Sequence, residues 1–179
     1  VMRVSESGTP CTPASFASSN PPIGQYDREY GHTPSVVADK GSAFLRGMRS
    51  ADLATTVKHF PGLGHVTANT DTASGVKDTV TTRTSGDITP FRAAITAGAR
   101  MVMLSSAIYT RIDASQPAVF SPKVIGLLRD QLGFQGVIVS DDLGSAEQNG
   151  LRLFHRLAAG LGLADEGVEL VFRNCAAAG

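Results

Sequence analysis

The feature that most constrains the fold is a repeated alternation of helix-like and strand-like segments. Helix-like stretches begin at Thr33-Pro34, Thr89-Pro90 and Ser121-Pro122, where proline suits the backbone of the first turn. The hydroxyl groups of Thr33 and Ser121 can also cap the helices that follow them. Short apolar segments predict strands at Leu53–His59, Met101–Leu104 and Val137–Ser140. Because helices separate these strands, the pattern predicts an α/β fold with a parallel sheet covered by helices.

A further helix-like stretch from Leu151 to Leu161 and a strand-like segment at Val168–Phe172 extend this pattern to four strands. A closed (β/α)₈ barrel needs eight strands, so the chain reads as an incomplete barrel. A flavodoxin-like open sheet remains the alternative, because alternation alone does not distinguish an open from a closed parallel sheet. Residues 1–19 are rich in Ser, Thr and Pro and are expected to be irregular, whereas residues 20–179 are expected to form the domain.

Composition excludes several classes of function. With 179 residues, 42% of them apolar, the chain can bury one sizeable core. Its 16 basic and 16 acidic side chains cancel, so no broad positive field is expected to attract nucleic acid or anionic lipid. We find no apolar run long enough to span a membrane and no leader pattern, so the sequence predicts no localisation. Cys11 and Cys175 match no metal or redox spacing, and no metal or cofactor is predicted.

Polar residues cluster where two predicted strands end. Lys58-His59-Phe60-Pro61-Gly62 closes the first strand, and Ser140-Asp141-Asp142 follows the third. Because the carboxyl ends of parallel strands meet at one edge, we expect Lys58, His59 and Asp141 to lie together there. Taken alone, each motif also has an ordinary interpretation, as a solvated turn or as a helix cap.

The segments KHFPGLG and GFQGVIVSDDL, with the intervening DITPFRAAITAGARMVMLSSAIY and the upstream NPPIGQYDREYG, resemble glycoside hydrolase family 3. The resemblance is to the β-N-acetylglucosaminidase (β-hexosaminidase) branch, including a lipoprotein-like sub-branch, and it runs from about residue 20 to residue 147. It implies the N-terminal catalytic domain of that family, here a partial (β/α)₈ TIM barrel covering roughly the second half. The implied activity is that of a retaining exo-glycosidase, which releases terminal β-linked N-acetylglucosamine from glycosides or cell-wall fragments.

The resemblance also implies roles for particular residues. Asp141 corresponds to the nucleophile that forms a covalent glycosyl-enzyme, and Asp142 to a supporting residue. Arg28, Lys58 and His59 correspond to side chains that bind sugar hydroxyl groups.

The long stretch from Pro61 to Asp87 departs from the family pattern. Where the branch carries an Asp-x-His pair, this chain has Asp71-Thr72-Ala73, and Leu63 stands where a second histidine is common. Asp71, as acid/base or loop orienter, and His65 are therefore the candidates for proton transfer. A connection of this length is expected to be functional or disordered.

Other interpretations stay open. A β-glucosidase-type family 3 hydrolase is the nearest one, and an inactive fragment or sugar-binding module is another, since barrel strands and the expected histidine are missing. An open-sheet receiver is disfavoured by the Lys58-His59 turn. Asp71 also suits an Asx turn, and ordinary packing is favoured for Ser106 and Tyr109.

Overall fold

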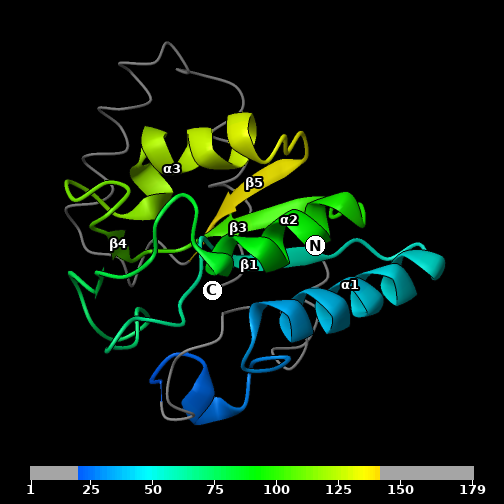
Figure 1. The fold of residues 1–179 in the computed structure, drawn as a ribbon, viewed down its shortest axis with the longest axis horizontal. Coiled ribbons are helices and arrows are strands. Elements are labelled where there is room, and N and C mark those ends of the chain that lie inside the picture. Colours follow the sequence, from blue (N-terminus) through cyan, green and yellow to red (C-terminus); the bar gives the residue numbers. More distant parts are fainter. Residues whose placement is uncertain (1–19, 142–179) are drawn as a thin grey trace, which may run out of the picture.

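A computed structural model of the chain describes residues 20–141. Figure 1 shows its main elements in sequence colours. The helices and strands, in chain order, are α1 (Pro34–Ser50), β1 (Thr56–Phe60), β2 (Lys77–Asp78), α2 (Thr89–Thr96), β3 (Met101–Leu104), β4 (Ile108–Tyr109), α3 (Pro122–Gly126) and β5 (Val137–Ser140). Short 3₁₀ turns lie at Gly24–Tyr26, Gly86–Ile88 and Ala118–Phe120, and a π-helical turn at Leu127–Gln131 follows α3.

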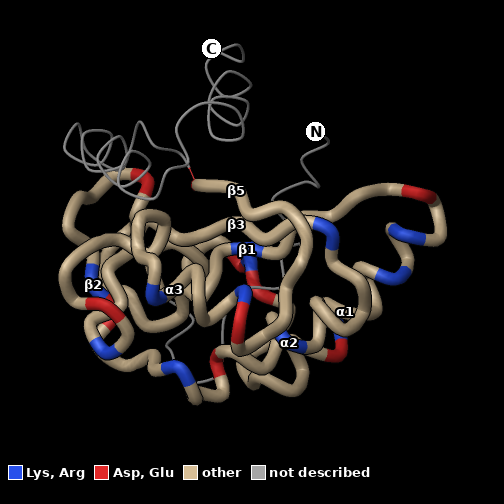
Figure 2. Tube along the Cα trace, turned by 90° about the horizontal axis from the view of Figure 1, so that it is seen from above, with Lys and Arg blue, Asp and Glu red and all other residues tan. Residues whose placement is uncertain are grey.

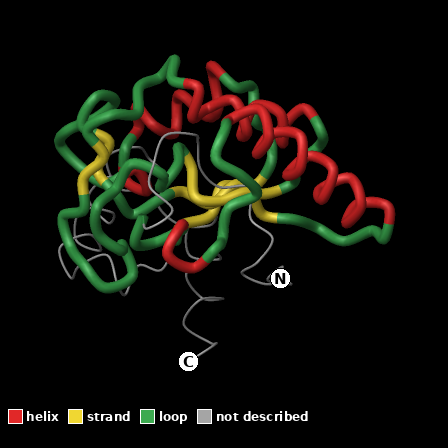
Figure 3. The backbone as a smooth tube through the Cα atoms, turned by 60° about the horizontal axis from the view of Figure 1, so that its bottom comes forward, coloured by secondary structure: helices red, strands yellow, loops and turns green. Residues whose placement is uncertain are grey.

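Strands β1, β3 and β5 form a parallel sheet in that order. Thr56 pairs with Met101, and Met101 pairs with Val137, so the three strands begin in register. The longer helices gather on one side of the strands (Figure 3). The predicted parallel α/β arrangement is therefore confirmed between residues 20 and 141, whereas the segments predicted at Leu151–Leu161 and Val168–Phe172 lie outside the described residues.

The first strand begins later than the sequence pattern predicted. Asp52 has a left-handed backbone with φ of 54°, and pairing with β3 starts only at Thr56. Leu53 is apolar but belongs to the connection that follows this turn. The apolar pattern therefore made the predicted strand longer than the segment that actually pairs with a neighbouring strand.

Side-chain caps begin two of the helices as predicted. The Thr33 hydroxyl accepts a hydrogen bond from the Val36 amide, and the Ser121 hydroxyl accepts one from the Val124 amide. The predicted helix that runs on toward Leu132 is correct in position, but it widens into the π-helical turn before Gly133, whose φ is 68°. Within residues 20–141, none of the helices is both long and apolar enough to cross a membrane.

The stretch from Pro61 to Asp87 contains regular structure that the sequence pattern did not reveal. Strand β2 pairs in parallel with β4 through Lys77–Ile108 and Asp78–Tyr109. The buried Asp78 carboxylate accepts hydrogen bonds from the Val80 and Thr81 amides and from the Thr81 hydroxyl. This two-residue strand is too short to show a periodicity of its own.

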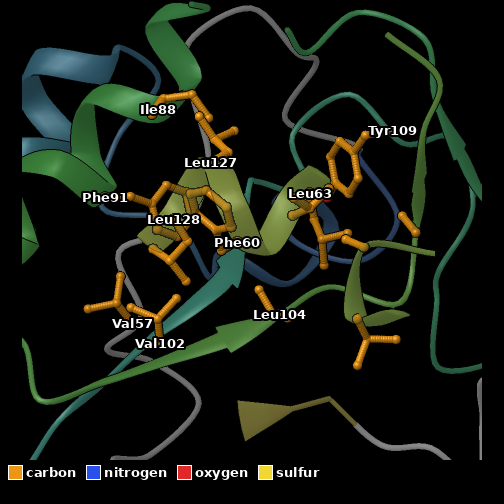
Figure 4. Packing of buried hydrophobic residues seen from close by; sticks show 14 of the residues in the cluster. Val57, Phe60, Leu63, Ile88, Phe91, Val102, Leu104, Tyr109, Leu127 and Leu128 are labelled. Carbon is orange, nitrogen blue, oxygen red and sulfur yellow. The ribbon is translucent and has the colours of Figure 1, made fainter. Parts of the chain in front are cut away.

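The core lies between the sheet and the helices that cover it (Figure 4). Val57 and Phe60 of β1 and Val102 and Leu104 of β3 are buried. The Phe60 ring meets Phe91 of α2 edge to face, with 5.0 Å between ring centroids. This packing fixes α2 against the carboxyl half of β1 and thus supports the edge where that strand ends.

Replacing Phe91 with alanine should lower the free energy of unfolding by about 3–5 kcal/mol, because a fully buried ring leaves a cavity. Urea unfolding followed by circular dichroism measures this loss. Tyr26→Ala is the control, because its side chain is 58% exposed, and it should change stability by no more than about 0.5 kcal/mol. Equal losses in the two variants would contradict the packing described.

Candidate functional site

Backbone pairing brings the ends of β1, β3 and β5 to one edge of the sheet. The Ser105 amide donates to the Phe60 carbonyl at 2.9 Å, and the Asp141 amide donates to the Leu104 carbonyl at 3.2 Å. The polar residues at the end of each strand therefore lie at the same edge of the sheet, its carboxyl edge. The expectation that His59 and Asp141 share this edge is confirmed.

A contact between two side chains at this edge joins His59 to Asp141. His59 Nε2 lies 3.4 Å from Asp141 Oδ2, and the two side chains are 6% and 16% exposed. The Lys58–His59 and Phe60–Pro61 peptide bonds, which flank the imidazole, are both cis. The site thus has a nearly buried imidazole beside a carboxylate that solvent still reaches.

The surroundings of His59 favour its neutral form. Burial lowers the pKa of His59 well below its ordinary value of 6.5, and the positive charges of Lys58 and Arg28 lower it further. The pKa is low even though a carboxylate lies beside the ring. At neutral pH the imidazole is therefore uncharged and can offer one N–H donor and one acceptor.

Arg28 reaches this region from the segment that follows Gly24–Tyr26. Its Nη1 donates to the Pro22 carbonyl at 2.7 Å, and its Nε is buried with no hydrogen-bond partner among residues 20–141. Lys58 is partly exposed and precedes His59 directly. Since both cations act on His59 electrostatically, the structure brings Arg28, Lys58, His59 and Asp141 into one neighbourhood.

The segment that carries Arg28 is tied to the loop that follows β1. The buried Asn20 side-chain amide donates to the carbonyl groups of Leu63, Gly64 and Val66 at 3.1, 3.2 and 2.7 Å. Tyr109 adds a second tie, because its hydroxyl donates to the Gly62 carbonyl. The base of the loop is thus held from two sides.

His65 forms a different pair. Its Nε2 lies 3.4 Å from Asp87 Oδ1, and both side chains are 10% exposed. The Thr81 hydroxyl contacts the carboxylates of both Asp78 and Asp87. Bonding to Asp87 outweighs partial burial and raises the pKa of His65 above 6.5.

Sequence reasoning missed Asp87 as the partner of His65. The two residues are 22 positions apart, and an aspartate just ahead of Thr89-Pro90 suggests a helix start rather than a histidine partner. Only the folded loop brings them together.

Asp71 lies on an exposed part of the same loop. Its backbone amide donates to Asn69 Oδ1 at 2.9 Å, as in an Asx turn, and its side chain faces solvent. Neither Asp71 nor His65 is therefore brought against Asp141 in this structure. Asp142 lies outside the described residues.

Two further positions named from the sequence fit the packing interpretation. Leu63, where the family pattern often has histidine, is 1% exposed in the core, and Tyr109 is fully buried. Ser106 is partly exposed next to the end of β3.

Taken together, the edge offers one carboxylate, a neutral imidazole and two cations. A carboxylate can act as a nucleophile or base, and the other groups suit a ligand rich in hydroxyl groups. Such a set can bind and attack an uncharged polar ring.

Comparison with known proteins agrees with this chemistry. The model of the glycosyl hydrolase family 3 N-terminal domain matches residues 12–164. A β-hexosaminidase of Stenotrophomonas maltophilia is 45% identical over 123 residues, which are 67% of this chain and 36% of that protein.

Solved structures give the same picture. A β-N-acetylhexosaminidase from Beutenbergia cavernae aligns with a TM-score of 0.75 and 43% identity, over 82% of this chain and 47% of that one. A family 3 β-N-acetylglucosaminidase from Paenibacillus aligns with a TM-score of 0.68 and 34% identity, over 75% of this chain and 26% of that one. The chain thus spans less than half the length of these relatives.

The His65–Asp87 pair predicts a pH-dependent contribution to stability. A raised pKa means that the folded state prefers protonated His65, so the stabilisation is complete below about pH 6.5 and is lost as pH rises through the raised pKa. His65→Gln should therefore reduce the free energy of unfolding more at about pH 5.5 than at about pH 8.5. Urea unfolding at both pH values measures the difference.

The matched control repeats His65→Gln in an Asp87→Asn background. There the imidazolium has lost its principal partner, so the pH dependence of the effect should largely disappear. An unchanged pH dependence in that background would assign it to another group.

Proposed function

Because the chain belongs to glycosyl hydrolase family 3, we propose that it carries part of the catalytic barrel of a retaining β-N-acetylhexosaminidase. The substrate would be a glycoside or cell-wall fragment with terminal β-linked N-acetylglucosamine. The observation that carries this proposal is the 3.4 Å contact between His59 and Asp141 at the carboxyl edge of a parallel sheet. Active sites of (β/α)₈ enzymes lie at this edge.

In the proposed mechanism Asp141 attacks the anomeric carbon of the bound sugar. The bond to the leaving oxygen breaks as the Asp141–carbon bond forms, and the leaving oxygen takes a proton from an acid. Water then attacks the same carbon, gives a proton to the conjugate base, and releases Asp141 and the sugar. Neutral His59 beside the carboxylate would hold Asp141 without neutralising its charge.

Arg28 and Lys58 would bind sugar hydroxyl groups near this carboxylate. The buried Arg28 Nε has no hydrogen-bond partner among residues 20–141, which supports a role for this side chain toward a ligand. Neutral His59 would join them as a third polar contact, because an uncharged imidazole has both a donor and an acceptor nitrogen. This proposal requires no metal ion or organic cofactor.

For the acid/base we favour Asp71 over His65. The imidazole of His65 already has Asp87 as a partner, whereas the Asp71 side chain is exposed on residues 67–75, the tip of the loop. Gly75, with φ of 62°, can bend this tip. Closure over a sugar would bring Asp71 toward the roughly 5 Å separation of a retaining pair.

We also propose that β1, β3 and β5 belong to the second half of a (β/α)₈ barrel. Their parallel order, with helices on one side of the strands, supports this assignment. A second candidate is an inactive fragment or a sugar-binding module, because Asp71-Thr72-Ala73 has alanine where the family's Asp-x-His pair has histidine. A β-glucosidase-type specificity is distinguished by comparing aryl β-N-acetylglucosaminide with aryl β-glucoside as substrates.

Asp141→Asn should reduce turnover of an aryl β-N-acetylglucosaminide by several orders of magnitude, because the amide cannot attack the anomeric carbon. Binding of N-acetylglucosamine should persist, and mass spectrometry should detect the glycosyl-enzyme only in the parent protein. Asp130→Asn is the matched control, since Asp130 is exposed. Activity of Asp141→Asn within about tenfold of the parent would remove Asp141 from the nucleophile role.

Asp71→Ala should act differently on two kinds of substrate. A natural glycoside needs protonation of its leaving oxygen and should slow by about 10²- to 10⁴-fold, whereas an activated aryl leaving group needs little help to form the intermediate. Pre-steady-state kinetics should therefore show a retained burst with slow turnover. Equal loss on both substrates would make Asp71 part of the loop scaffold, and no loss on either would exclude it.

A further inference from the structure

A shallow pocket of about 620 Å³ opens between α1 and α2. Its lining consists of arginine, threonine and alanine side chains, namely Arg46, Arg49, Thr89, Arg92, Ala93, Thr96 and Ala97. None of these residues belongs to the sheet or to the His59–Asp141 edge, so the proposed hydrolysis does not use this pocket.

Helical spacing explains why the arginines converge. Arg46 and Arg49 are three residues apart and share one face of α1. Thr89, Arg92 and Thr96 form a stripe along α2. Because α1 and α2 pack against each other, both stripes border the same pocket, and Figure 2 shows basic positions on both helices.

Arg49 is held in place by the end of α2. Its Nη1 donates to the Ala97 carbonyl at 2.7 Å. Gly98 has φ of 89°, and a Cβ atom there would lie 2.0 Å from Arg49 Nη1, so glycine leaves the space that this guanidinium occupies. The remaining N–H groups of Arg49 are thereby positioned at the pocket.

The other two guanidinium groups are not paired with any carboxylate that the structure describes. Arg46 and Arg92 are exposed, and among residues 20–141 no ion pair to either one is formed. The chain as a whole has zero net charge, yet the described residues that line this pocket carry three positive charges and no acidic group. A local excess of this kind favours an anionic ligand.

We propose that this pocket binds a small polyanion bearing phosphate or carboxylate groups. Planar guanidinium groups match the oxygen pairs of both chemistries, and the hydroxyl groups of Thr89 and Thr96 can add hydrogen bonds. The volume is that of a small-molecule site rather than of an extended polymer groove. The ligand is thus a compact molecule with at least two negative charges.

Isothermal titration calorimetry of the whole chain tests this proposal, with pyrophosphate and citrate as probes. The double variant Arg46→Ala/Arg92→Ala should bind the recognised probe at least about tenfold more weakly than the parent. The matched control is Lys77→Ala/Arg111→Ala, which removes the same charge from exposed positions outside the pocket. This control should retain parental affinity.

The two probes separate the sources of the anion. Saturable binding of pyrophosphate alone assigns a phosphate ligand, and binding of citrate alone assigns a carboxylate ligand. No saturable binding of either probe up to about 10 mM would overturn the proposal. Equal weakening in both double variants would also overturn it, because it would show a general effect of charge.

Discussion

The whole candidate site depends on the parallel register of β1, β3 and β5. The strands start level at Thr56, Met101 and Val137, and an irregularity in β1 between Val57 and Phe60 absorbs its extra residue, so that Phe60, Leu104 and Ser140 are also level. The backbone hydrogen bonds from Ser105 to Phe60 and from Asp141 to Leu104 continue the ladder past the last paired residues. This pairing fixes the backbone at the end of each strand and therefore the positions of the side chains that follow it. Apolar packing between the sheet and α2, centred on Phe60 and Phe91, supports the carboxyl edge of the sheet.

The electrostatics of the edge follow from burial as much as from charge. Burial, reinforced by the positive charges of Lys58 and Arg28, lowers the pKa of His59, and the neutral imidazole then lies beside Asp141 as a dipole rather than as a counter-ion. His65 shows the opposite case, in which an aspartate raises the pKa of a less deeply buried ring. Both histidines lie 3.4 Å from an aspartate carboxylate, so the opposite directions of their pKa shifts follow from the deeper burial of His59 and from the cations near it.

Much of this arrangement could be predicted from the sequence, because it rests on local patterns. A threonine or serine followed by proline marked the start of each helix. Polar residues directly after the apolar strand segments marked the edge that the strands share. The predicted start of β1 at Leu53 was wrong, because a strand begins where it pairs with a neighbouring strand and not where the sequence becomes apolar. The β2–β4 pair and the His65–Asp87 contact join residues far apart along the chain, and no local pattern encodes such contacts.

The Asn20 amide divides the loop after β1 into two mechanically different parts. The Asn20 side chain donates to three backbone carbonyl groups at the base, those of Leu63, Gly64 and Val66, whereas residues 67–75 are mostly exposed. The base and the tip of the loop can therefore change independently. Under the proposed mechanism, substitutions or insertions at the tip would alter the surroundings of the leaving group, while the geometry of the His59–Asp141 edge would stay the same.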